Sequence, residues 1–189
     1  MILPIYAYGH PVLKRRAEAI PPDYPELAKL LEDMWATMYN AEGIGLAAPQ
    51  IGKSIRIFLV DTKQFDKDEE DETKREGIKM AFINAEKLEE GGEEWAYEEG
   101  CLSIPNVSGD VDRPAQIRLR WVDENFQQHE QTFTGMDARV IQHEYDHIEG
   151  VLFTEYLKPI KRRLIKRKLD NIKKGKAWAA YKMRFPKLK

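Results

Sequence analysis

The segment His143-Glu144-Tyr145-Asp146-His147 places two imidazoles four residues apart, with a glutamate directly after the first. On a helix, residues four apart lie on one face, so both histidines can bind a single metal ion. Glu144 can then move a proton to or from a water molecule at that ion, which is the chemistry of metal-assisted hydrolysis. The motif therefore predicts a metal-dependent hydrolase. The alternative is two histidines packed on an ordinary helix.

A catalytic site of this kind needs a third protein ligand and one open position. No histidine follows His147, and Phe153 stands where a common metalloprotease pattern has its third histidine. The acidic residues after His147 match no downstream pattern either, so the third ligand is expected upstream. The candidates are His10, His129, one of many carboxylates, and the only cysteine, Cys101.

The elements that must position these groups follow from the hydrophobic pattern. Residues 25–41 repeat apolar side chains at three- and four-residue spacing, which predicts a helix. Another helix is expected to begin after Gly135 and carry the two histidines. Short apolar or alternating runs predict strands at residues 55–61, 80–85, 116–123 and 127–133, the last two as a hairpin. Residues 106–113 are rich in turn-forming residues and are predicted to be a loop.

Two glycine-containing segments could approach a ligand closely. Residues 43–52 combine three glycines with small side chains, and Gln50 within them could donate a hydrogen bond to a carbonyl oxygen. Gly100 directly precedes Cys101, which leaves the backbone there open to a ligand. By contrast, the strongly charged residues 62–77 are predicted to form a solvated loop.

Composition limits the class of protein. The chain has 189 residues and 42% hydrophobic residues, which suits one domain with a sizeable core and leaves room for an appendage. A single cysteine excludes an internal disulfide framework. The N-terminal residues do not form a signal peptide, and no apolar stretch is long enough to span a membrane. We therefore expect a soluble, cytoplasmic protein that makes no use of a membrane.

The net charge of −2 conceals a strong asymmetry. Residues 158–189 contain 14 Lys and Arg against one acidic residue, Asp170, so the remainder carries a charge of −15. Residues 159–174 are helix-capable, and Trp178, Tyr181 and Phe185 are interleaved with basic residues after them. A basic tail on an acidic body favours a polyanionic partner.

Three segments together resemble the peptide deformylase family, whose signatures are G-x-G-x-A-A-x-Q, E-G-C-L-S and H-E-x-x-H. In this chain they are Gly43 to Gln50, Glu99 to Ser103, and His143 to His147. The resemblance runs to about residue 157. It implies a catalytic domain at residues 1–157, followed by a basic C-terminal helix or tail at 158–189. The implied fold is α+β, with small antiparallel β-sheets packed around a central helix that carries the H-E-x-x-H motif.

The resemblance implies that Cys101 joins His143 and His147 as the third ligand. One divalent ion per chain is expected, usually Fe²⁺ in this family, and Zn²⁺, Ni²⁺ or Co²⁺ can occupy the site. The ligand set itself does not choose between Zn²⁺ and Fe²⁺.

The implied reaction removes the formyl group from the N-terminal N-formylmethionine of newly made polypeptides. A metal-bound hydroxide would attack the formyl carbon, and Glu144 would act as general base and then general acid. The Gln50 amide and the backbone N–H of Leu102 would stabilise the oxyanion.

Residues matched around the motifs are expected to bind the substrate. They are Ile44, Gly45, Tyr97, Glu99, Gly100, Arg113, Met136 and Val140. Arg113 matches a family arginine near the substrate backbone. Arg139 departs from the family, which tends to have an apolar or small residue there.

The basic tail is predicted to contact the ribosome through rRNA. Two other functions are considered. An H-E-x-x-H peptidase that cuts internal peptide bonds would keep its metal and activity after Cys101→Ser. A non-catalytic, ribosome-associated protein would not need the intact Glu144 and Gln50.

Overall fold

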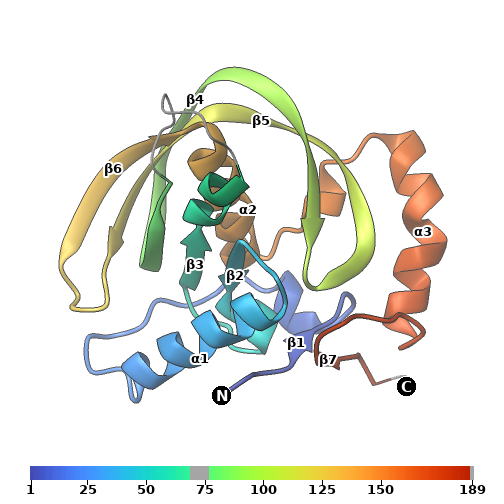
Figure 1. Cartoon of the computed structure of the whole chain (residues 1–189), viewed down its shortest axis with the longest axis horizontal. Helices are drawn as coiled ribbons and strands as arrows, with labels where there is room; N and C mark the ends of the chain where they lie inside the picture. The colour runs from blue at the N-terminus through green and yellow to red at the C-terminus, as the bar shows by residue number, and fades with distance from the viewer. Residues whose placement is uncertain (69–76, 188–189) are drawn as a thin grey trace.

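A computed structural model describes residues 1–68 and 77–187. The fold is α+β, as predicted, with a curved sheet wrapped around helix α2 (Gly135–Glu149), which lies at the centre of the molecule (Figure 1). The predicted small sheets form one five-stranded antiparallel sheet of order β2-β3-β4-β5-β6. A separate two-stranded sheet pairs β1 (Ile5–Tyr6) with β7 (Met183–Arg184), and this pair is parallel.

The five strands differ greatly in length. They are β2 (Gly45–Ala47), β3 (Ile57–Asp61), β4 (Lys79–Cys101), β5 (Ile104–Val122) and β6 (Gln128–Thr134). The predicted strands all fall within or next to these elements. Register shifts along the β4–β5 pair bend the two long strands into the arch seen in Figure 1.

One of the predicted loops is wrong, and another is wrong in its first part. Residues 106–113 belong to β5, because pairing such as Glu99 with Gly109 and Tyr97 with Val111 overrides the low strand propensity of their Asn, Asp and Gly residues. In the charged segment, Thr62–Asp68 forms a short 3₁₀ helix, η3. Residues 69–76 of that predicted loop lie outside the described residues.

Helix α2 has two different faces. Its sheet-facing side is buried against Phe58, Phe82 and Phe133, and this side carries Ala138, Ile141, Tyr145 and Ile148. Their spacing of three or four residues is the period of an amphipathic helix. Gly150 caps the helix with a left-handed φ of 74°. The sheet therefore fixes the helix, and the remaining face can carry the two histidines.

Helix α1 (Leu27–Asn40) supports the sheet from below in Figure 1. It begins two residues later than predicted, after Glu26, which has a left-handed φ of 56°. Its buried residues Leu30, Met34 and Met38 pack in a cluster with side chains of β2 and β3. Between α1 and β3, the short 3₁₀ helix η2 (Ala48–Ile51) carries Gln50.

The predicted basic C-terminal helix is α3 (Pro159–Lys173). Its buried residues Ile165 and Ile172 pack in a cluster with Val107 and Val111 of β5. Beyond α3 the chain turns back to the body, where β7 lies beside β1. The two other 3₁₀ helices are η1 (Pro11–Lys14) and η4 (Phe153–Glu155). A domain division at residue 157 stays a prediction. Among the described residues, no helix has the length and apolar character needed to cross a membrane.

Candidate metal centre

The end of β4 and the free face of α2 bring three ligand-type side chains together. One sulfur or nitrogen atom from each of Cys101, His143 and His147 lies within 4.8 Å of the corresponding atoms of the other two. The Cys101 Sγ is 3.3 Å from the His147 Nε2. A thiolate and two imidazoles in this arrangement fit a divalent transition-metal ion. In the described part of the chain, His10 and His129 are outside any such cluster.

Glu99 supports the first histidine from behind. Its Oε2 lies 2.9 Å from the His143 Nδ1, and the Arg113 guanidinium donates to both Glu99 oxygens, at 2.6 and 3.0 Å. Burial raises the pKa of Glu99, but hydrogen bonds from His143 and Arg113 outweigh it and hold the pKa well below its usual value. The ionised carboxylate fixes the ring orientation of His143, as acidic partners of metal-binding histidines commonly do.

Arg113 is buried behind Glu99 in the structure. It is 5% exposed, it donates to Asp146 Oδ2 at 2.8 Å as well as to Glu99, and it is not among the described residues that line the cavity. The predicted contact with the substrate backbone therefore stays a prediction. Arg113 positions Glu99, because a buried guanidinium needs carboxylate partners.

Arg139 departs from the family pattern, and its positive charge is balanced by partners within the cavity wall. It donates to Glu99 Oε1 at 3.0 Å and to the carbonyl oxygen of Val111 at 2.8 Å. Its guanidinium also stacks over the Trp95 ring, 4.4 Å from the centroid. Its charge is thus compensated, and its hydrocarbon stem can form part of an apolar surface.

Glu144 is buried beside β2. An ideal Cβ built on Gly45 would lie 2.5 Å from the Glu144 Oε1, so only glycine leaves room for this carboxylate. The Glu144 Oε2 is buried and has no hydrogen-bond partner in the described part of the chain. Burial raises the pKa of Glu144 to about 7. A carboxyl group with an uncommitted oxygen next to metal ligands is available to exchange a proton.

Gln50 reaches the centre from η2. The backbone N–H of Ala47 donates to its Oε1 at 2.9 Å, which fixes the amide so that Nε2 faces Cys101 Sγ at 3.4 Å and Ser103 Oγ at 3.3 Å. Leu102, the next residue after Cys101, lines the same cavity, and its carbonyl oxygen accepts a hydrogen bond from the Tyr181 hydroxyl at 2.8 Å. Gln50 Nε2 therefore lies at the centre and Leu102 lines the same cavity, and their roles as oxyanion donors stay predictions.

The two histidines differ in their electrostatics. Burial lowers the pKa of His143, but contacts with Cys101 and Glu99 outweigh it, so the pKa lies well above the usual value. Burial holds the pKa of His147 well below the usual value. His147 is therefore neutral, which is the form that binds a metal ion, while His143 would lose a proton on binding one.

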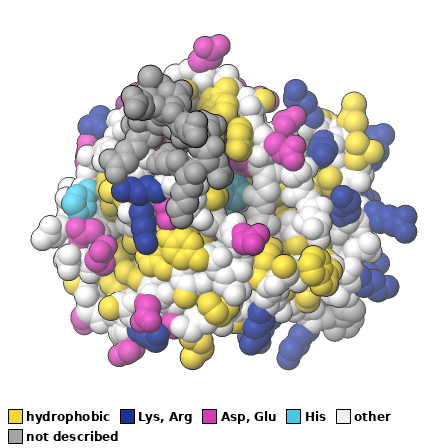
Figure 2. Space-filling model, in the orientation of Figure 1, with side chains coloured by type: hydrophobic (Ala, Val, Ile, Leu, Met, Phe, Trp, Pro, Cys, Tyr) yellow, Lys and Arg dark blue, Asp and Glu magenta, His cyan; other side chains and the backbone are white. Residues whose placement is uncertain are grey.

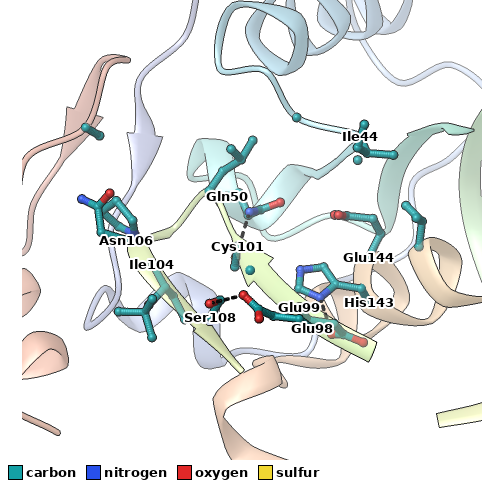
Figure 3. Close-up of a pocket in the computed structure, with 18 of the residues that line it drawn as sticks. Ile44, Gln50, Glu98, Glu99, Cys101, Ile104, Asn106, Ser108, His143 and Glu144 are labelled. Atoms are coloured by element: carbon teal, nitrogen blue, oxygen red, sulfur yellow. Dashed lines mark hydrogen bonds and ion pairs between the residues drawn. The ribbon is translucent and has the colours of Figure 1, made fainter. Parts of the chain in front are cut away.

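A cavity of about 720 Å³ opens over this centre. The predicted substrate residues Ile44, Gly45, Tyr97, Glu99, Gly100, Met136 and Val140 all line it, and Arg113 is the exception. Figure 3 shows Cys101 and Gln50 in its middle, with Ile44, Glu144 and His143 on one side and Ile104 and Asn106 on the other.

Other lining residues were not predicted. They are Phe65, Glu98, residues 104–108 and residues 178–181. The aromatic residues Trp178 and Tyr181 were visible in the sequence, but their basic surroundings favoured a polyanionic partner for the tail. Nothing in the local pattern indicates that the chain folds back to this cavity.

The chain matches a family model described as polypeptide deformylase over residues 2–163. It is 55% identical to a peptide deformylase of Christiangramia forsetii, over 100% of this chain and 98% of that protein. It is 52% identical to a peptide deformylase of Flavobacterium johnsoniae, over 98% of this chain and 96% of that protein.

Solved structures agree. A peptide deformylase from Legionella pneumophila is 36% identical, with a TM-score of 0.78, over 92% of this chain and 96% of that one. A peptide deformylase from Synechococcus elongatus, solved in complex with actinonin, is 34% identical, with a TM-score of 0.78, over 97% of this chain and 92% of that one.

Proposed function

The chain belongs to the peptide deformylase family, and from this premise we propose how its residues remove the formyl group from the N-terminal formylmethionine of new polypeptides. The observation that carries the proposal is the convergence of Cys101, His143 and His147 beside the buried, unpartnered oxygen of Glu144 in the described part of the chain. A cytoplasmic location is part of the proposal, because nascent chains are made there.

Cys101, His143 and His147 would hold the metal ion. When bound, a divalent ion here would activate a water molecule for attack and polarise the formyl oxygen. We propose Fe²⁺ on the basis of the family, and Zn²⁺, Ni²⁺ or Co²⁺ would suit the same donors. Measurement of the metal content of protein purified without oxygen tests this choice.

Glu144 would carry the proton. Its free Oε2 can accept a proton from the attacking water and deliver it to the departing amine. Because Gly45 has no Cβ, the carboxylate can lie close to β2, and the same oxygen would serve both steps. Proton transfer of this kind contributes roughly 10²- to 10⁴-fold to the rate.

Gln50 and Leu102 would stabilise the oxygen that becomes negative. The Gln50 amide is held by the backbone of Ala47, so its Nε2 needs no rearrangement to donate. The Leu102 backbone N–H is the second donor. Losing one such donor typically costs about 3–4 kcal/mol of barrier.

The methionine side chain would occupy the α2 side of the cavity. Ile44, Tyr97, Met136 and Val140 line this side, and Arg139 is compensated behind them. These are mostly apolar or aromatic surfaces, as a thioether chain requires.

The test compares hydrolysis of formyl-Met-Ala-Ser with that of its acetylated analogue, with Fe²⁺ and without oxygen. We expect deformylation and little deacetylation. Glu144→Gln should lower kcat by roughly 10²- to 10⁴-fold while the metal stays bound. Cys101→Ser should lose both metal and activity. Cleavage of internal bonds that survives Cys101→Ser would instead identify an H-E-x-x-H peptidase, and absence of any hydrolysis would favour a non-catalytic binding protein.

We also propose that α3 contacts rRNA. Lys161, Arg162, Arg163, Lys166, Arg167 and Lys168 are all exposed on it, and Figure 2 shows Lys and Arg side chains gathered over this helix. Phosphate contacts make binding depend steeply on salt. The double variant R163Q/R167Q should weaken ribosome binding and reduce its salt slope by about one per lost contact. The control R118Q/R120Q removes two exposed arginines from β5. If the two double variants weaken ribosome binding equally, a specific role for α3 is refuted.

A further inference from the structure

The segment that follows α3 forms one wall of the catalytic cavity. Residues 178–181 line it together with residues 104–108 at the start of β5, where Figure 3 shows Ile104 and Asn106 across the cavity from Ile44 and His143. The cavity therefore extends well past the surfaces assigned above to the formyl group and the methionine side chain. Its volume of about 720 Å³ suits a ligand larger than a single residue, since sites for drug-sized molecules measure roughly 300–1,000 Å³.

Specific contacts hold this wall in place. The Asn106 Nδ2 donates to the carbonyl oxygen of Trp178 at 2.9 Å, and the Tyr181 hydroxyl donates to that of Leu102 at 2.8 Å. The next residues are anchored by β-pairing, where the N–H of Ile5 donates to the carbonyl oxygen of Lys182 at 2.9 Å. The segment is thus tied to the centre at one end and to the N-terminal strand at the other.

The Trp178 side chain is left largely uncovered on this wall. It is 74% exposed, although tryptophan is usually well buried. Phe65 and Tyr97, at 39% and 38% exposed, line the same cavity. Exposed aromatic rings that gather at one cavity are typical of a binding surface for apolar groups.

A formylated polypeptide continues beyond its methionine and has to leave the cavity. With the methionine on the α2 side, the opposite side remains for the following residues (Figure 3). We propose that residues 178–181 bind the substrate residues after methionine, and that Trp178 selects apolar or aromatic side chains among them. This inference rests on the proposed function.

The test measures kcat and KM for three substrates, formyl-Met-Leu-Phe, formyl-Met-Gly-Gly and formylmethioninamide. The wild type should prefer the first peptide to the second. Trp178→Ala should lower kcat/KM for formyl-Met-Leu-Phe by roughly 5- to 20-fold, mainly through KM, because it removes contacts made equally before and during reaction. It should leave formylmethioninamide within about twofold of the wild type. Because Trp178 is largely exposed, the variant should fold.

Ile160→Ala is the matched control, since Ile160 is 77% exposed on α3 and does not line the cavity. Ile160→Ala should leave kcat/KM unchanged for all three substrates. This inference alone is overturned if Trp178→Ala has the same kcat/KM values as the wild type, or if it lowers kcat/KM by the same factor for all three substrates. A wild type that hydrolyses none of them overturns the proposed function and this inference with it.

Discussion

Replacement of Gly45 by alanine should separate catalysis from both stability and metal binding. The three atoms nearest to an added Cβ all belong to Glu144, with Oε1 at 2.5 Å and Cδ and Cγ at 2.7 Å. Ordinary contact with a Cβ begins at 3.4 Å, so the carboxylate must retreat by 0.9 Å. A misplacement of about 1 Å in a catalytic group can cost 10²-fold in rate. We therefore expect kcat of Gly45→Ala to fall by about 10²-fold, or ~2.7 kcal/mol of barrier.

The other properties should change little. The Glu144 Oε2 has no hydrogen-bond partner to lose in the described part of the chain, and Gly45 does not have a positive φ. The assay is kcat and KM with formyl-Met-Ala-Ser, alongside metal content and urea unfolding. Gly91→Ala is the control, because a Cβ there meets nothing within 4 Å.

A double-mutant cycle makes the test stricter. Glu144→Gln already removes proton transfer, so displacing the side chain at position 144 should not lower kcat any further. Gly45→Ala should therefore have no additional effect on kcat when Glu144→Gln is present. The reasoning is refuted if Gly45→Ala keeps kcat within about threefold of the wild type. It is equally refuted if the two substitutions lower kcat independently.

Two further substitutions probe the groups around the centre. Glu99→Gln breaks the buried ion pairs of Glu99 with Arg113 and Arg139, leaves Arg113 with Asp146, and should destabilise the fold by about 3–5 kcal/mol at neutral pH in urea unfolding. The pKa of Glu99 is held below its usual 4.5, so the ionised carboxylate stabilises the fold fully above that pH and loses this effect as the pH falls. The difference in free energy of unfolding between the wild type and Glu99→Gln should therefore narrow at acid pH. A difference that stays constant with pH would contradict this role of Glu99. Tyr181→Phe removes the hydrogen bond to the Leu102 carbonyl and should cost roughly 1 kcal/mol of stability. It should also lower kcat more than it raises KM, because Leu102 is held less firmly; an unchanged kcat would show that Tyr181 only supports the fold.

The sequence could predict the local part of the site but not its assembly. The spacing of His143 and His147 is a property of any helix, so their shared face follows from the sequence alone. The third ligand does not, because Cys101 reaches them only through the arch of β4 and β5. Residue spacing left four kinds of candidate open, and only the family resemblance selected the cysteine.

Arg139 shows a second limit of sequence reasoning. A charged residue beside an apolar pocket looked out of place, and the structure compensates it with Glu99, 40 residues away, and with the carbonyl of Val111. The same network explains Arg113, which was expected at the substrate and lies behind Glu99 instead. Partners so distant in sequence are defined by the long β4–β5 pairing, which no local pattern encodes.

The C-terminal residues form two structurally different parts, for which we propose two separate roles, although their composition had suggested a single basic tail. The basic face of α3 points outward, whereas residues 178–181 line the cavity and β7 pairs with β1. Truncation after Lys174 would therefore remove a wall of the substrate site while sparing α3. We expect it to lower kcat/KM on free tripeptides by at least about tenfold in the absence of ribosomes. Because such a truncation damages the enzyme itself, its effect on nascent chains says nothing about rRNA contact, which only substitutions on α3 can test. A truncated enzyme with full activity on free peptides would show that the two roles are not divided in this way.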